Sequence, residues 1–143
     1  MSLELKKFDM NMIKDDKVVV FIGKRETGKS YLVRDMLFHK QNMPVGTVIS
    51  GTEGANAFYS NMMPSIFIHG EYRPEIIKNV LKRQKKVICA IKKDVLDSGN
   101  SNIDPRAFLI LDDCLYDKTW VNNKDIRALF MNGRHYKMLF IIT

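Results

Sequence analysis

Residues 23–30 read GKRETGKS: two glycines five positions apart, then at once a lysine and a hydroxyl residue. This spacing is typical of a loop that binds the phosphates of a nucleotide. Gly23 and Gly28 can adopt backbone angles that are closed to other residues, so the loop N–H groups can turn toward phosphate oxygens. Lys29 can place its charge beside the β- and γ-phosphates, and Ser30 can offer its oxygen to Mg²⁺.

The flanking sequence favours this interpretation over a glycine turn beside a solvated lysine. Residues 18–22 form an unbroken β-branched and aromatic run, typical of a strand buried on both faces, and a helical pattern follows the loop. Strand, loop and helix are the context that such a motif needs. We therefore expect ATP with Mg²⁺ to be held by Gly23, Lys24, Arg25, Glu26, Thr27, Gly28, Lys29, Ser30 and Tyr31.

A second group of candidate residues closes an apolar run farther along the chain. Residues 108–111 read FLIL and are followed by Asp112 and Asp113. In such a pair the first carboxylate holds Mg²⁺, usually through water, and the second can polarise an attacking water. The alternative is a charged strand end in solvent, because loops favour aspartate.

The elements that must position these residues alternate along the chain. Apolar β-branched runs predict strands over 17–22, 45–50, 107–111 and 138–142, with a short one at 66–69. Helices are expected after the loop as far as Pro44, briefly around 56–61, over a long stretch from Pro74, and over 123–131. This order predicts an α/β fold with a largely parallel sheet, in which ligands sit at the carboxyl ends of strands.

Length and composition predict one domain over residues 1–143. Hydrophobic residues make up 45% and charged residues 27%, as in ordinary globular proteins, and no apolar run approaches a membrane span of about 20 residues. Cys89 and Cys114 lack metal-ligand spacing and are expected to be reduced thiols. The net charge of +7 favours polyanionic partners.

Basic residues gather in the long helical stretch, with six lysines and Arg83 over residues 78–93. They could follow a phosphate backbone, or they could be the solvated face of an amphipathic helix, which is the ordinary interpretation. No aromatic residue lies among them, so stacking on single-stranded bases is not indicated.

Beyond these patterns, the chain resembles a known family over nearly its whole length. The segments that carry the resemblance are 23–30, the run FLILDDCLYDKTW at 108–120, Ile126-Arg127, and the run MNGRHY at 131–136. They look like the poxvirus- and mimivirus-type genome-packaging ATPases of large nucleocytoplasmic DNA viruses, in the FtsK–HerA superfamily. The resemblance implies a RecA-like P-loop three-layer sandwich that hydrolyses ATP to drive double-stranded DNA into a capsid.

The same resemblance implies partners, a location and residue roles. A ring-shaped homo-oligomer, capsid or portal-like vertex proteins, and the host cytoplasm (viral factory) or the virion are implied. By motif match, Lys29 and Ser30 take the phosphate and metal roles, Asp112 takes the metal role, and Asp113 stands where many relatives use glutamate as the base. Arg134 either reaches a γ-phosphate, in its own or a neighbouring subunit, or is a cation at a helix C-terminus that meets the helix dipole.

One departure from the family pattern lies at the end of the chain. The superfamily places a polar sensor residue, commonly glutamine, after the fourth core strand, whereas this sequence stops at Thr143. We therefore expect a P-loop core that is incomplete on its C-terminal side. The alternative function is a nucleotide-binding or assembly module with little or no catalysis. A small-molecule kinase is a weaker alternative, because no arginine-rich lid is evident.

Overall fold

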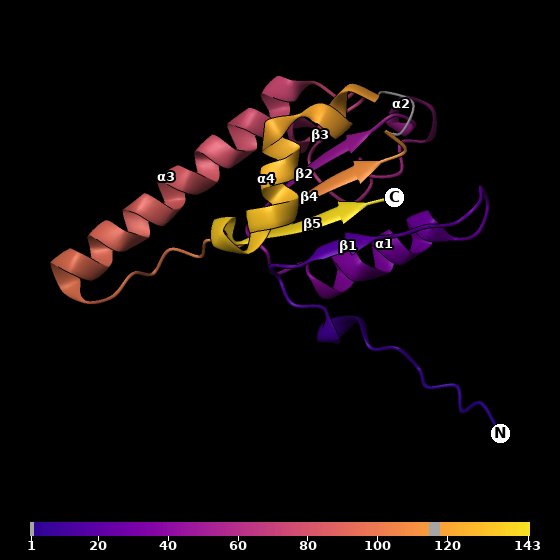
Figure 1. Ribbon diagram of the computed structural model, residues 1–143, viewed down its shortest axis with the longest axis horizontal. Helices are drawn as coiled ribbons and strands as arrows, with labels where there is room; N and C mark the ends of the chain where they lie inside the picture. Colours follow the sequence, from indigo (N-terminus) through magenta and orange to yellow (C-terminus); the bar gives the residue numbers. More distant parts are fainter. Residues whose placement is uncertain (1, 115–117) are drawn as a thin grey trace.

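A single parallel sheet forms the centre of the molecule. The computed structural model describes residues 2–114 and 118–143, and within them five strands pair in the order β1-β5-β4-β2-β3 (Figure 1). Every pairing is parallel, as the alternation of strands and helices predicts, so the carboxyl ends of all strands meet at one edge. The strands are β1 (Val18–Val20), β2 (Val45–Ser50), β3 (Ile68–His69), β4 (Ala107–Asp112) and β5 (Met138–Ile142).

The described residues also form four α-helices, which cover both faces of the sheet (Figure 1). Helix α1 (Lys29–His39) packs on one face, and α3 (Pro74–Ser98) and α4 (Lys124–Asn132) pack on the other. The short α2 (Glu53–Asn56) follows β2. Short 3-10 helices complete the chain: η1 (Met10–Met12), η2 (Ser65–Phe67), η3 (Lys118–Asn122) and η4 (Gly133–Tyr136).

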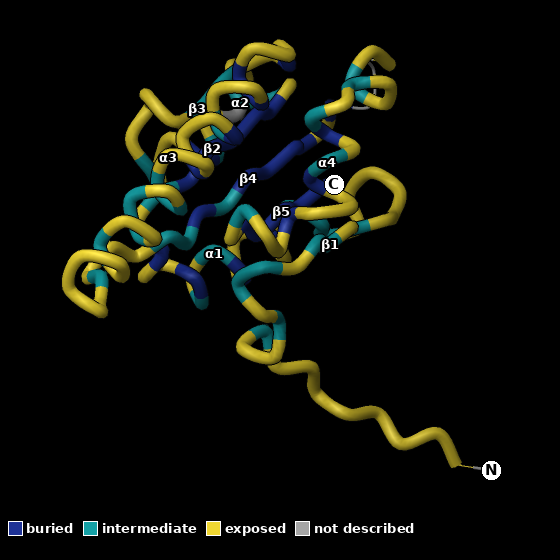
Figure 2. The backbone as a smooth tube through the Cα atoms, turned by 60° about the vertical axis from the view of Figure 1, so that its left-hand side comes forward, coloured by how far each residue is buried: buried dark blue, intermediate teal, exposed yellow. Residues whose placement is uncertain are grey.

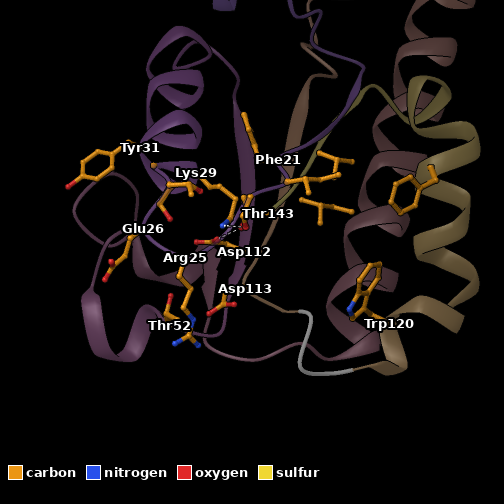
Figure 3. A pocket seen from close by; sticks show the side chains of 18 residues that line it. Phe21, Arg25, Glu26, Lys29, Tyr31, Thr52, Asp112, Asp113, Trp120 and Thr143 are labelled. Carbon is orange, nitrogen blue, oxygen red and sulfur yellow. Dashed lines mark hydrogen bonds between the residues drawn. The ribbon is translucent and has the colours of Figure 1, made fainter.

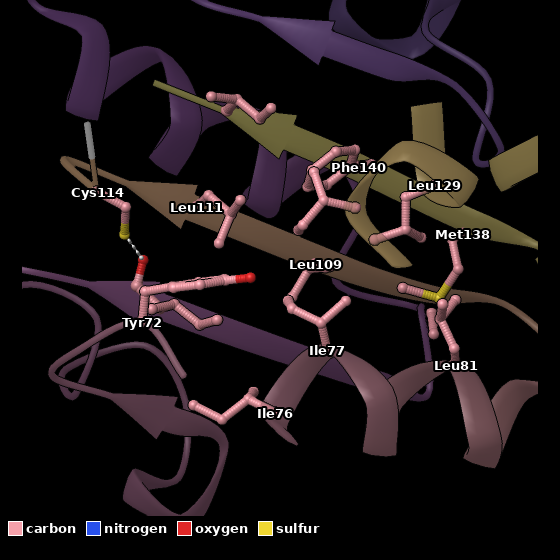
Figure 4. Close-up of a cluster of buried hydrophobic side chains, with 14 residues drawn as sticks. Tyr72, Ile76, Ile77, Leu81, Leu109, Leu111, Cys114, Leu129, Met138 and Phe140 are labelled. Atoms are coloured by element: carbon pink, nitrogen blue, oxygen red, sulfur yellow. Dashed lines mark hydrogen bonds between the residues drawn. The ribbon is translucent and has the colours of Figure 1, made fainter. Parts of the chain in front are cut away.

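Alternate residues of the central strands build the two halves of the core. In β4, Leu109 and Leu111 point toward α3 and α4, whereas Ile110 points toward α1. The α3 side brings Ile77 and Leu81 of that helix against the strand residues (Figure 4). Figure 2 shows the resulting pattern, with buried strands at the centre and exposed loops around them. Burial on both faces explains why these strands read as continuous apolar runs.

The first strand differs from the expectation of burial on both faces. Within the described residues β1 lies at the edge of the sheet and pairs with β5 alone. Val20 is 49% exposed and Ile22 is 92% exposed. The expectation was wrong because an apolar β-branched run predicts a strand but does not indicate how many strands pair with it or how far other elements bury its faces.

The segment after β2 also differs from its predicted helix over 56–61. Helix α2 ends earlier, because Ala57 adopts a left-handed conformation with φ of 47°. The carboxylate of Glu53 then accepts hydrogen bonds from the N–H groups of Tyr59, at 2.9 Å, and Ser60, at 2.8 Å. These bonds hold the segment as a turn and carry the Tyr59 side chain into the core.

An ion cluster fastens the N-terminal segment to the body. Asp15 accepts hydrogen bonds from Lys40, at 2.6 Å, and from Arg106, at 3.0 Å. Burial alone would raise the pKa of Asp15, but the hydrogen bonds from Lys40 and Arg106 outweigh it and hold that pKa below its usual value. Across the described ranges, no helix combines the length and apolar character needed to cross a membrane.

Candidate active site

The glycine-containing loop joins β1 to α1 at the carboxyl edge of the sheet. Gly28 adopts a left-handed conformation with φ of 87°, which favours glycine. A Cβ on Gly23 would lie 2.7 Å from Oγ1 of Thr27, so a larger residue there would displace the hydroxyl that donates to the Lys24 carbonyl. Helix α1 begins at Lys29 and has no side-chain cap. Its first N–H groups and the positive end of its dipole are therefore available to an anion.

The lysine of the loop folds back over the backbone that precedes it. Lys29 Nζ donates hydrogen bonds to the carbonyls of Gly23, at 2.7 Å, and Lys24, at 2.8 Å. The Thr27 hydroxyl donates to the same Lys24 carbonyl at 2.6 Å. These bonds close the loop and hold a positive charge at its centre, where a phosphate group could replace the carbonyls as partner.

The first carboxylate of the acidic pair is fixed at the end of β4. Asp112 is buried, and its Oδ2 accepts a hydrogen bond from the Tyr59 hydroxyl at 2.8 Å. Its Oδ1 accepts from the Thr143 hydroxyl. Burial is the larger cause, and the nearby charge of Asp112 the second, of a raised pKa of Tyr59. The tyrosine therefore remains a neutral donor. Two hydroxyl groups from distant parts of the chain thus orient one carboxylate.

Strand pairing brings these distant residues to the same place. Asp112 of β4 pairs with Ser50 of β2, and Thr143 N–H donates to the Leu111 carbonyl at 3.0 Å. On the other side, Phe21 N–H donates to the Ile142 carbonyl at 2.9 Å. The ends of β1, β5, β4 and β2 are therefore held in register where the loop begins.

Both predicted groups of residues line a single cavity of about 890 Å³ (Figure 3). Its lining includes Gly23, Arg25, Glu26, Thr27, Gly28, Lys29, Ser30, Tyr31, Asp112, Asp113 and Thr143. The structure thus brings the loop and the acidic pair together. Asp113 leaves the strand with a positive φ of 53° and is exposed, so its carboxylate is open to solvent.

Two predicted residues stand apart from this cavity. The Lys24 side chain is not among the lining groups, and its carbonyl serves the loop instead. Arg134 lies in η4, directly before β5, whereas the cavity lies beyond the other end of that strand. The structure therefore does not bring Arg134 to the loop of its own chain. A role toward a neighbouring subunit stays a prediction.

Sequence reasoning missed several residues of the site. Tyr59 and Glu53 follow β2, a position that points to the carboxyl edge, but their spacing matches no motif considered above. Tyr59 and Glu53 lie behind Asp112 and do not line the cavity, whereas Thr52, Trp120 and Phe130 do. Only the fold shows that these segments meet the loop.

The oxygen donors of the site suit a magnesium ion bound together with phosphates. Ser30 and Asp112 offer a hydroxyl and a carboxylate, and Mg²⁺ in phosphate sites takes few protein ligands alongside water and phosphate oxygens. Within the described ranges, no group of three or more His, Cys, Asp or Glu residues is placed to hold a metal by itself.

Comparison with known proteins finds relatives in large DNA viruses. The chain is 40% identical over 143 residues to an uncharacterized protein of Acanthamoeba polyphaga mimivirus, covering 99% of this chain and 50% of that protein. It is 44% identical over 149 residues to one of Invertebrate iridescent virus 6, covering 97% and 54%. It is 38% identical over 126 residues to one of Frog virus 3, covering 87% and 36%. No family model and no solved structure matches.

These relatives place the chain among proteins of large DNA viruses, and the chain spans about half the length of the curated relatives it matches. Their names give no activity. Of the resembling run at 108–120, residues 115–117 lie outside the described residues.

Proposed function

We propose that this chain is the ATP-binding and hydrolysing motor domain of a viral DNA-packaging ATPase with a RecA-like P-loop fold. The observation that carries the proposal is that Lys29 of the loop and Asp112 of β4 line one cavity, although 83 positions (112 − 29) separate them. A phosphate-binding lysine and a metal-binding carboxylate must share one nucleotide in such enzymes.

The connections of the sheet support a nucleotide at this edge. The chain leaves β1 for α1 on one face and leaves β4 for α4 on the other, and β5 lies between the two strands. Where connections from nearby strands leave the sheet on opposite faces, a crevice opens at the carboxyl ends of those strands. The cavity occupies this position.

Within this site, each residue has a distinct role toward the triphosphate. The N–H groups of the loop and of the α1 start bind phosphate oxygens, and Lys29 leaves its two carbonyls for the β- and γ-phosphates. Ser30 and, through water, Asp112 would hold Mg²⁺, which neutralises charge on the phosphates when bound. Asp113 accepts the proton of a water that attacks the γ-phosphorus as the bond to the leaving ADP oxygen breaks.

The partners and setting follow from the resemblance together with the viral relatives. Double-stranded DNA is the proposed cargo, capsid or portal-like vertex proteins are the proposed docking partners, and the viral factory in the host cytoplasm or the virion is the proposed location. Arg134 does not line the cavity of its own chain. It can act in catalysis only in a homo-oligomer, where it would reach the nucleotide of a neighbouring subunit.

A second candidate is a nucleotide-binding or assembly module without useful turnover. The observation that favours it is that Asp113 has a short side chain on a left-handed backbone. Many members of the family that this chain resembles carry the longer glutamate at this position, which reaches farther toward an attacking water. This candidate predicts binding of ATP with Mg²⁺ and negligible phosphate release.

Phosphate release with and without duplex DNA distinguishes the two candidates. The proposed motor predicts ATP hydrolysis that rises with DNA and collapses in Lys29→Ala. Lys6→Ala is the matched control, because it removes the same charge from the exposed N-terminal segment, outside the cavity. Turnover that survives Lys29→Ala, or that ignores DNA, would contradict the motor. Binding without release would favour the module.

A further inference from the structure

Helix α3 extends well past the sheet against which it packs. It has 25 residues, but its buried residues all lie between Ile76 and Gln84. The Gln84 amide donates to the carbonyls of Pro105 and Tyr136, each at 2.8 Å, near the amino ends of β4 and β5. The remaining residues, 85–98, therefore continue beyond that edge for about 21 Å. Figure 1 shows this projection.

The exposed side of this helix carries a stripe of positive charge. The lysine stripe consists of six exposed residues: Lys78, Lys82, Lys85, Lys86, Lys92 and Lys93. At 3.6 residues per turn they fall within a sector of about 120° that contains none of the buried residues Ile77, Leu81 and Gln84. Asp94 and Asp97 fall outside this sector, and Glu75 lies inside it only at the helix start.

The charges of the stripe are not neutralised by the chain itself. Within the described residues, the salt bridges involve other cations, and none includes a lysine of the stripe. Lys85 has a different partner, the ring of Tyr136 at 5.9 Å from its Nζ. Like charges so arranged repel one another and attract a polyanion.

We propose that the lysine stripe binds the backbone of duplex DNA. From Lys78 to Lys93 it is about 22 Å long, and a duplex carries one negative charge per roughly 1.7 Å of its axis. Helix α3 contains no aromatic residue, so it offers contacts to phosphates but no platform for single-stranded bases. The choice of DNA as the polyanion rests on the proposed function, whereas the stripe itself rests on its geometry.

The position of the stripe separates DNA from the nucleotide. The nucleotide cavity lies at the carboxyl edge of the sheet, and no lysine of the stripe lines it. The four lysines after Gln84 lie on the part of α3 that projects past the amino edge. Both ligands can therefore bind one chain at the same time. The stripe can therefore be altered without changing the positive loop around Lys29, which separates its effect from general attraction of DNA to that loop.

A charge-matched pair of variants tests the proposal. The stripe variant is Lys82→Gln, Lys86→Gln, Lys93→Gln, and the control is Lys6→Gln, Lys7→Gln, Lys14→Gln in the exposed N-terminal segment. Glutamine keeps helix propensity near that of lysine, so α3 remains folded. Anisotropy of a short labelled duplex of arbitrary sequence then gives Kd over about 0.05 to 0.2 M salt.

The stripe variant is expected to raise Kd at least about tenfold and to make the log–log salt slope shallower by about 3. The control is expected to change both far less. Equal losses in the two variants, or no duplex binding by the unaltered chain, would overturn the proposal. Nucleotide binding measured on the same variants keeps the two claims distinct. Stripe-dependent DNA binding without ATP hydrolysis would support the stripe and contradict the motor.

Discussion

The Tyr59 hydroxyl donates a hydrogen bond of 2.8 Å to Oδ2 of Asp112, across 53 positions of sequence. Tyr59 is completely buried, and its own segment is held by the Glu53 carboxylate. The bond therefore sets the orientation of the carboxylate before any ligand arrives. Outer partners of this kind fix how a metal-binding group presents its oxygens.

Replacing Tyr59 by phenylalanine removes this bond with little change in volume. We expect Tyr59→Phe to raise the Mg²⁺ concentration for half-maximal ATP hydrolysis by about tenfold or more. The cost to folding stability is expected to be about 1 kcal/mol. A Mg²⁺ titration of phosphate release, together with thermal unfolding, measures both effects.

Tyr136→Phe is the control for that experiment, because it removes a hydroxyl from η4 at the opposite edge of the sheet. Its Mg²⁺ dependence should match that of the unaltered chain. If Tyr59→Phe lost stability but kept the same Mg²⁺ dependence, Tyr59 would have a structural role only.

Asp113 is expected to act on the attacking water and not on binding. Its exposed carboxylate lines the cavity but lies outside β4. Asp113→Asn keeps the size of the side chain and tolerates the left-handed backbone. We expect kcat to fall by about 10² or more while the Kd for ATP stays within about twofold. Single-turnover phosphate release and nucleotide titration measure the two quantities. An equal loss of affinity would instead assign Asp113 to binding.

The two cysteines are expected to differ strongly in reactivity. Cys89 is exposed on α3, whereas Cys114 is 3% exposed and donates to the Ile49 carbonyl. Burial raises the pKa of the Cys114 thiol to about 11, so at neutral pH it holds almost no thiolate. A thiol reagent should therefore label Cys89 alone in the folded chain and both residues in denaturant. Rapid labelling of native Cys114 would contradict the packing at the end of β4.

The Asp15 cluster predicts a pH-dependent contribution to stability. The pKa of Asp15 lies below its unfolded value of about 3.9, so its contribution is present above that pH and is lost as pH falls through the folded pKa. Asp15→Asn should reduce the free energy of unfolding at pH 7 by about 1 to 3 kcal/mol, since it removes a charged partner of the buried Lys40.

Chemical denaturation at several pH values tests this prediction. The difference between Asp15→Asn and the unaltered chain should shrink as pH falls below about 4, because protonated Asp15 no longer carries its charge. Asp97→Asn, which changes an exposed residue of α3, serves as the control and should cost little at either pH. A difference that stayed constant with pH would show that the charge of Asp15 is not what stabilises the fold.

The sequence predicted the main features of the fold because its strands and helices carry strong local signals. Residues 45–50 and 138–142 form strands with the predicted bounds, and the long helix begins at Pro74 as expected. The neighbours of a strand are a tertiary property, however. The apolar run 18–22 therefore did not indicate that β1 would be an edge strand with Val20 half-exposed.

Within the site, too, the residues with a local sequence pattern were predicted, and those placed by long-range contacts were not. The loop and the acidic pair follow recognisable spacings, and the parallel sheet brings both to one cavity. Tyr59 has no such signal, because its position depends on Glu53 turning the chain after β2. Arg134 follows a motif by resemblance, but the strand that comes after it separates it from the cavity of its own chain.

A structure of the chain with Mg²⁺ and a non-hydrolysable ATP analogue tests the central claim most directly. The proposed site predicts that Lys29 Nζ leaves the carbonyls of Gly23 and Lys24 to bind the β- and γ-phosphates. It also predicts that Asp112 holds the ion of the same nucleotide through water. A nucleotide bound outside this cavity, or one that Lys29 contacts while its ion lies out of reach of Asp112, would contradict the proposed function.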